Sequence, residues 1–167
     1  MTRLVQHAAL IAATITTGLM AGLFAAFAYA IMPALRGADD RTFVEAMQRI
    51  NATIVNGWFM LSFLGAVAFA ALSAVLAWRG EGRPALPWII GGLALYLLTV
   101  IVTIAVNVPL NDALAAAGEP GRIADLSAVR ERFEASWVTW NIVRALTNTA
   151  AFGCLTWALM VRGNAAG

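Results

Sequence analysis

Arg144 is the residue in this sequence most able to carry chemistry, because it is a cation inside the last apolar stretch. Residues 145 to 160 hold no further charge. A cation within a membrane costs at least a few kcal/mol, so it usually faces a bundle interior or a water-filled cavity and marks a functional position. Arg144 is therefore the first candidate for a site.

The polar residues around Arg144 share one helical face. Trp137, Asn141, Arg144 and Asn148 are separated by four, three and four positions, which is the spacing of one side of a helix. At about 1.5 Å per residue, Arg144 lies roughly 10 Å below Trp137 and within the hydrocarbon layer. The pattern predicts a buried polar face on the last apolar helix.

The composition is that of a membrane protein, with 61% hydrophobic and 12% charged residues. A soluble domain is nearer half apolar and a quarter charged. About 20 apolar residues cross a bilayer core, and the chain offers four such runs, at about 8–32, 58–78, 88–110 and 137–161. We predict an all-α fold, a single integral membrane domain over residues 1–167 that forms an up-and-down four-helix transmembrane bundle. The first run is about twice the length of a signal-peptide core, so we expect it to be retained.

The connections between these runs contain helical signals of their own. Asp39 or Asp40 can cap a short amphipathic helix, which we expect on the membrane surface or over the mouth of the bundle. Its apolar positions recur every three or four residues, at Phe43, Ala46, Met47, Ile50 and Ile54. Pro33 is expected to end the first helix. The third connection, 111–136, is expected to hold a separate charged helix over about 123–135.

An up-and-down bundle brings four chain segments to one membrane face: the end of span one, the start of span two, the end of span three and the start of span four. The opposite half of the bundle offers almost nothing polar beyond Thr and Ser, whereas ten polar and aromatic residues belong to this face. They are Tyr29, Asn51, Asn56, Trp58, Asn107, Asn111, Trp137, Trp140, Asn141 and Arg144. We therefore expect one polar neighbourhood.

The end of span three contributes amides to that neighbourhood. Asn107 and Asn111 are four residues apart and share a helical face. Pro109 cannot donate its backbone hydrogen bond and frees the carbonyl of Ala105, which predicts a kinked, partly open helix end.

Two interpretations of Arg144 stay open on these residues. In the structural one, Arg144 pairs with an asparagine and freed carbonyls to hold spans three and four together, or extends past Trp140 to the interface. In the functional one, the arginine and the amides bind an anionic or oxygen-rich planar ligand between aromatic walls, because arginine stacks on rings and donates to oxygen in a fixed fork.

The sequence lacks the residues that several kinds of chemistry require. His7 is the one histidine, so no histidine metal cluster, haem pair or Ser-His-Asp triad is expected. No glycine-rich phosphate loop is present, and no nucleic-acid partner is expected, because the arginines are scattered among carboxylates. The spans contain no Asp or Glu, which argues against a proton pump. We expect no cofactor and no metal.

Four segments together resemble the anthrone oxygenase family, small four-span membrane proteins whose bacterial members are mostly of unknown function. The segments are Gly18-Leu-Met-Ala-Gly22 to Met32-Pro33, Met47-Gln-Arg-Ile-Asn51, Ala105-Val-Asn107-Val-Pro109-Leu-Asn111, and Arg132-Phe-Glu-Ala-Ser-Trp137-Val-Thr-Trp140-Asn141-Ile-Val-Arg144. The last two are the specific ones. The resemblance implies a cofactor-free oxygenase that uses O2 to convert an anthrone methylene to a quinone carbonyl.

The resemblance also implies roles for the polar neighbourhood. Arg144 would stabilise enolate or peroxide charge, with Asn107 and Asn141 as hydrogen-bond donors. Substrate-binding positions would be Trp137, Trp140, Asn111 and Tyr29, the tryptophans by stacking. The family often has histidine after the span-four asparagine, whereas this chain has Ile142, so the nearest candidate bases are Glu134 and Asp112.

A non-enzymatic protein is the alternative prediction. The chain would then bind a lipid or quinone, or act as an accessory subunit, with the same cluster organising the bundle. As partners we expect the lipid bilayer, a hydrophobic aromatic small molecule and O2, and a homo-oligomer through Gly18 and Gly22. We expect an inner (plasma) membrane location with both termini in the cytoplasm.

Overall fold

The computed structural model of the protein describes residues 2–80 and 82–164. It is all-α: about 90% of it is helical, and the described residues form no strand. The predicted fold class is therefore confirmed at that level.

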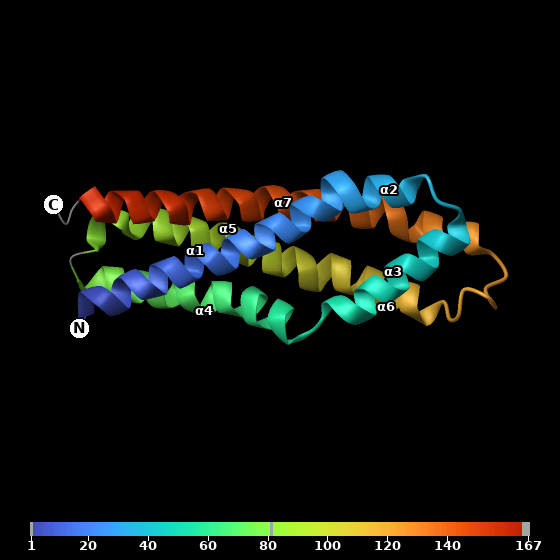
Figure 1. Ribbon diagram of the computed structural model, residues 1–167, viewed down its shortest axis with the longest axis horizontal. Coiled ribbons are helices and arrows are strands. Elements are labelled where there is room, and N and C mark those ends of the chain that lie inside the picture. Colours follow the sequence, from blue (N-terminus) through green and yellow to red (C-terminus); the bar gives the residue numbers. More distant parts are fainter. Residues whose placement is uncertain (1, 81, 165–167) are drawn as a thin grey trace.

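Four long helices run side by side along the molecule (Figure 1). They are α1 (Thr2–Ala26), α4 (Gly57–Arg79), α5 (Leu86–Val102) and α7 (Leu126–Asn164). Helix α1 packs on α4 and α7, and α5 packs on the same two helices. The two ends of the chain lie at one end of the molecule, and α3 (Asp40–Ile54) lies at the other (Figure 1). A short 3-10 turn, η2 (Arg83–Ala85), precedes α5.

Three helices in the described residues are long and apolar enough to cross a membrane. They cover Arg3–Arg36, Gly57–Arg79 and Arg83–Ala116, and they contain the first three predicted spans. The fourth predicted span, 137–161, lies within α7, where Asn141, Arg144 and Asn148 lower the hydropathy of the segment. The apolar helices indicate a membrane protein, while the four-span topology stays a prediction.

Pro33 does not end the first helix, which corrects our expectation. A π-helical turn, η1 (Phe27–Ile31), follows α1, and the helix continues as α2 (Met32–Arg36) with Pro33 in its first turn. The backbone N–H of Met32 bonds to the carbonyl of Phe27, five residues back. Proline is tolerated in a first helical turn, where its missing N–H is not needed.

The third apolar helix is also longer than predicted. Helix α5 passes through a second π-helical turn, η3 (Thr103–Asn107), into α6 (Val108–Ala116), again with proline in the first turn of the new segment. The π turn η3 occupies the place where we predicted a kink and an open helix end. In it, the backbone N–H of Val108 donates a hydrogen bond to the carbonyl of Thr103. Both prolines are therefore accommodated by π turns rather than by helix ends.

The third connection is shorter than predicted, because its charged helix is not separate. Residues 126 to 136 are the first part of α7, which continues without a break to Asn164. The sequence from residue 122 to 152 contains neither glycine nor proline, so nothing in it interrupts the helical hydrogen bonds. Asp125 accepts a hydrogen bond from the backbone of Ala128 (2.9 Å) at the start of the helix.

Helix α3 confirms the predicted amphipathic helix. Its N-cap is Asp39, whose carboxylate accepts hydrogen bonds from the backbone N–H (3.0 Å) and the hydroxyl (2.7 Å) of Thr42. Its buried side chains are Phe43, Val44 and Met47, and the helix packs on α6 and α7. It therefore covers the end of the molecule opposite the termini.

Replacing Asp39 by alanine should lower the melting temperature at neutral pH, because the cap of α3 is lost. The Thr42 hydrogen bonds hold the pKa of Asp39 below its usual value. The stability that the carboxylate contributes is therefore present above the unfolded-state pKa and is lost as the pH falls through the lowered pKa. Thermal unfolding in detergent across the acidic range should show the difference between wild type and Asp39→Ala shrinking with acid. Asp39→Asn, which can still cap, is the control, and a pH-independent difference would contradict this assignment.

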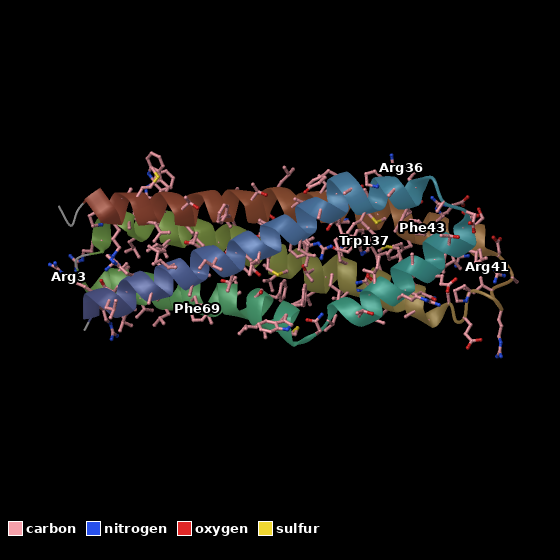
Figure 2. All side chains as sticks on the ribbon, in the orientation of Figure 1. Arg3, Arg36, Arg41, Phe43, Phe69 and Trp137 are labelled. Carbon is pink, nitrogen blue, oxygen red and sulfur yellow. The ribbon has the colours of Figure 1, made fainter. Side chains whose placement is uncertain are left out.

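Two apolar cores occupy the ends of the molecule. The α3-side core consists of Phe27, Met32, Phe43, Val44, Met47, Leu114, Phe133 and Trp137. The termini-side core consists of Leu10, Ala13, Ala70, Ala77, Ala85, Ile89, Leu155 and Ala158. Figure 2 shows Phe43 and Trp137 among the side chains between α3 and its neighbours. The polar residues of α7 at 141, 144 and 148 lie between these two cores in the sequence.

Candidate functional site

Arg144 lies in the interior of the helix assembly, with 6% of its surface exposed. Its Nη2 donates to Oδ1 of Asn141 (3.0 Å), and its Nη1 makes a longer contact with the hydroxyl of Thr103 (3.5 Å). The guanidinium carbon lies 4.5 Å from the centre of the Phe24 ring and 5.5 Å from that of Trp137. The cation is thus held between α1, η3 and α7.

No carboxylate in the described part of the chain forms an ion pair with Arg144. At the α3 end, by contrast, the partly buried Arg130 forms ion pairs with Glu134 (2.7 Å) and Asp40 (3.1 Å). The Nε of Arg144 is buried and has no hydrogen-bond partner in the protein. A buried cation is normally paired with an opposite charge. Arg144 has no such partner among the described carboxylates, so no ion pair neutralises its positive charge.

Asn141 positions the guanidinium. Its Oδ1 accepts from Arg144, and its Nδ2 donates to the backbone carbonyl of Phe24 (3.1 Å). The oxygen and the nitrogen of the Asn141 amide therefore both form hydrogen bonds. The side chain is 1% exposed and has little freedom to move. The bond to Phe24 ties α7 to α1 directly beside the ring that stacks on Arg144.

The other amides of the cluster surround Trp137. Asn107 Nδ2 donates to the backbone carbonyl of Trp137 at a long 3.4 Å, and its buried Oδ1 has no partner in the protein. The indole Nε1 of Trp137 donates to Oδ1 of Asn111 (2.8 Å). We call Arg144, Asn141, Asn107, Asn111 and Trp137, with Phe24 and Thr103, the Arg144 cluster.

Both π turns contact the Arg144 cluster. Turn η3 begins with Thr103 and ends with Asn107, and η1 begins with Phe27, whose ring centre lies 5.5 Å from that of Trp137. Single π turns inside α-helices are rare and occur frequently at functional sites. In this protein they bring Thr103 and Asn107 of η3 and Phe27 of η1 to the same part of α7.

Two of the predicted site residues lie outside the cluster. Trp140 is 38% exposed and Tyr29 is 73% exposed. One helical residue turns the side chain by about 100°, which carries Trp140 away from the face of Asn141. Arg144 itself does not extend past Trp140 to the interface, because its guanidinium is buried beside Asn141.

The remaining residues of the predicted face have separate roles. Asn56 is the N-cap of α4 and accepts from the backbone of Trp58 (3.0 Å) and Phe59 (3.1 Å). Trp58 is 81% exposed, and the Nδ2 of Asn51 is buried without a partner. Phe24 and Thr103 were not predicted. Thr103 lies four residues before Asn107, so the helical spacing could have placed both on one face. Nothing in the sequence distinguishes Phe24 from other core residues.

Neither candidate base lies at Arg144. Glu134 is ten residues away along α7, about 15 Å, and it is bonded to Arg130. That hydrogen bond raises the pKa of Arg130, with a further contribution from Asp40. Asp112 is exposed on α6. Both carboxylates belong to the α3 end of the molecule.

A groove of about 430 Å³ lies between the first helix and α7. It is lined by Ala25, Ala28, Tyr29, Ile142, Ala145, Leu146, Thr149 and Ala150, and we call it the α1–α7 groove. A second cavity, of about 460 Å³, lies between α6 and α7 and includes Leu110 and Arg132. Arg144 lines neither of them. Tyr29, a predicted substrate-binding residue, lines the α1–α7 groove, and so does Ile142.

Two asparagines on one face of α7 should respond oppositely to leucine. Asn148 is fully buried, and neither of its side-chain polar atoms has a partner in the protein. An unsatisfied buried polar group costs about 1–3 kcal/mol, so Asn148→Leu should raise the free energy of unfolding by that order. Asn141→Leu should lower it, because Arg144 and the Phe24 carbonyl lose their partner. Denaturant unfolding of both variants in detergent tests this, and equal losses of stability would contradict it.

Comparison with known proteins gives one assignment. No curated protein and no solved structure matches the sequence. The family model described as anthrone oxygenase matches residues 59–154, which is more than half of the chain and contains Asn107, Trp137, Asn141 and Arg144. The match runs from α4 into α7 and confirms the resemblance carried by the sequence motifs, so the protein belongs to the anthrone oxygenase family.

Proposed function

We propose that this protein is a membrane-embedded, cofactor-free oxygenase that oxidises a planar phenolic, anthrone-like substrate to a quinone with O2. Membership of the family supports the reaction class, and the apolar helices support a substrate taken from the bilayer. The single observation that carries the proposal is the buried Arg144, which has hydrogen bonds and aromatic neighbours but no carboxylate.

The first step of the proposed reaction forms an anion, so a positively charged side chain can promote it without a metal or a flavin. Loss of a methylene proton converts an anthrone to an enolate, whose negative oxygen is electron-rich enough to react with O2 directly. A preorganised cation in a low-dielectric site stabilises such an anion far better than water does. Arg144 supplies the cation, and Asn141 holds its guanidinium in place.

The overall reaction balances without another reactant. The methylene carbon gives up two hydrogens and gains one oxygen atom of O2 as the new carbonyl. The second oxygen atom leaves with the two hydrogens as water, so the four electrons lost by the substrate reduce one O2 completely. The residues of the Arg144 cluster bind and polarise the substrate, and no role as general base is assigned to them.

We also propose that α7 crosses the membrane with the three more apolar helices. It packs on α1 and α5, and its polar Asn141, Arg144 and Asn148 are buried inside the assembly. Its exposed large side chains over the same length are apolar, namely Ile142, Leu146, Phe152, Trp157 and Met160. Lipid would therefore meet an apolar surface. Four spans place both termini on one side, which we assign to the cytoplasm of an inner membrane.

A purely structural cluster is the second candidate, because one observation favours it. Side-chain hydrogen bonds from Asn141 and Arg144 join α7 to α1 and to η3. In that case the protein would act as a lipid- or quinone-binding or accessory subunit, and the same residues would serve only to hold the helices together.

Oxygen uptake with a simple anthrone tests the proposal. The purified protein in lipid nanodiscs should consume O2 and form anthraquinone faster than empty nanodiscs, which correct for spontaneous oxidation. With ¹⁸O2, the quinone should gain one labelled oxygen atom. A rate equal to that of empty nanodiscs would overturn the enzymatic proposal and leave the structural one.

A further inference from the structure

Packed apolar side chains flank the Arg144 cluster toward both ends of the molecule. On one side lies the α3-side core, in which Phe43 and Met47 are fully buried and Trp137 is 4% exposed. On the other lies the termini-side core, whose Leu10, Ile89 and Leu155 are fully buried. A planar substrate would have to displace several packed side chains to enter from either end, and close-packed interiors resist such displacement.

We propose that the α1–α7 groove is the lateral site at which a planar, oxygen-bearing aromatic molecule leaves the bilayer and enters toward Arg144. This inference rests on the proposed function and adds the route and the binding surface to it. Three groove residues each directly follow a cluster residue in the sequence. Ala25 follows Phe24, Ile142 follows Asn141 and Ala145 follows Arg144. The groove is thus the outer side of the same helix segments whose inner side holds the cation.

Half of the residues that line the groove have small side chains. Four of the residues that line the groove are alanines, at positions 25, 28, 145 and 150. Ala145 also belongs to the buried cluster that includes Phe24. An alanine presents a single methyl group, so these positions offer little steric obstruction to a molecule that enters between α1 and α7.

One wall of the groove is built from a π turn. Ala28 and Tyr29 belong to η1, where the hydrogen-bond ladder departs from regular α geometry. Single π turns inside helices occur frequently at functional sites. Tyr29 is 73% exposed at this wall, and its ring carries an apolar body with a polar hydroxyl, which suits contact with a phenolic ring system.

Size and charge favour an aromatic oxygen compound as the occupant. A volume of about 430 Å³ lies within the range of small-molecule sites, roughly 300–1,000 Å³. The lining is mostly apolar, and the groove residue Ala145 directly follows the buried Arg144 in the sequence. A rigid planar molecule with an oxygen at its edge satisfies both the apolar lining and the cation, whereas an acyl chain satisfies only the lining.

Filling the groove tests the inference. Ala28→Phe and Ala150→Phe place a ring in the groove, and Ala94→Phe places the same ring on an exposed position of α5 that does not line it. Two quantities are measured in nanodiscs: kcat/KM for anthrone, and equilibrium binding of radiolabelled anthraquinone. We expect both groove variants to lose about 10- to 200-fold in kcat/KM and in affinity, the range over which hydrophobic pockets discriminate. Ala94→Phe should match the wild type.

The two measurements separate this inference from the proposed function. Wild-type oxidation with unchanged kcat/KM and unchanged anthraquinone affinity in both groove variants would overturn the groove and leave the function standing. Saturable anthraquinone binding that the groove variants abolish, without oxidation by the wild type, would support the groove and overturn the function. Melting temperatures identify any variant that does not fold, and Ala150→Leu, a smaller substitution at an exposed position, replaces it.

Discussion

Replacing Arg144 by alanine is expected to lower the rate of anthrone oxidation by about 10²- to 10³-fold, the usual cost of removing one preorganised stabiliser of an oxyanion. Arg144 is the buried cation of the cluster, and no carboxylate in the described residues diminishes its charge. Its loss removes the group that favours the enolate over the neutral anthrone. The effect should appear in kcat as well as in kcat/KM, because the charge develops during the reaction.

Oxygen uptake in nanodiscs measures this effect, and three further variants identify its cause. Arg144→Met keeps much of the side-chain volume and removes the charge, so it should be as slow as alanine. Arg144→Lys keeps the charge without the fork that bonds Asn141 and should retain part of the activity. Arg132→Ala removes an exposed arginine and should behave as wild type. Full activity of Arg144→Met would show that the charge is not used.

Trp137→Ala is expected to cause the largest loss of stability, about 3–5 kcal/mol in the free energy of unfolding, as for other buried tryptophans. The indole is 4% exposed; it stacks with the ring of Phe133 (5.9 Å between ring centres) and meets the ring of Phe27 at a tilt (5.5 Å). It also lies against the guanidinium of Arg144 and bonds to Asn111. Its removal therefore leaves a cavity and two polar groups with poorer contacts.

Denaturant unfolding in detergent, followed by circular dichroism, measures the Trp137 effect. Trp137→Phe keeps the ring contacts and loses the bond to Asn111, so its cost should be near 1 kcal/mol. Trp58→Ala is the matched control, because Trp58 is 81% exposed and surface substitutions usually cost no more than about 0.5 kcal/mol. Equal losses for Trp137→Ala and Trp58→Ala would contradict the central place of Trp137 in the α3-side core.

The Arg144 and Trp137 variants distinguish an effect on the reaction rate from an effect on the stability of the fold. Arg144 is expected to control the rate, whereas Trp137 joins the α3-side core to the cluster and is expected to control stability. A finding that both variants act only on stability would favour the structural candidate over the oxygenase.

Local rules explain which elements were predictable from the sequence. The N-cap Asp39 and the spacing of Phe43 and Met47 were sufficient to predict α3, because capping and amphipathic spacing act within a few residues. The helical face of Asn141 and Arg144 followed for the same reason. The prediction failed at Pro33, since the proline rule assumes regular α geometry and the chain uses a π turn there.

The composition and spacing of the chain by themselves determined an all-α membrane protein and the inward polar face of α7, and four sequence segments carried the resemblance to the anthrone oxygenase family. Which side chains meet Arg144 was decided by the tertiary structure. The packing of α1 against α7 brings the Phe24 ring and carbonyl to Arg144 and Asn141, and turns Trp140 and Tyr29 outward. These contacts depend on the rotation and register of helices far apart in the sequence, which no local pattern encodes. The same packing forms the α1–α7 groove, which Arg144 does not line.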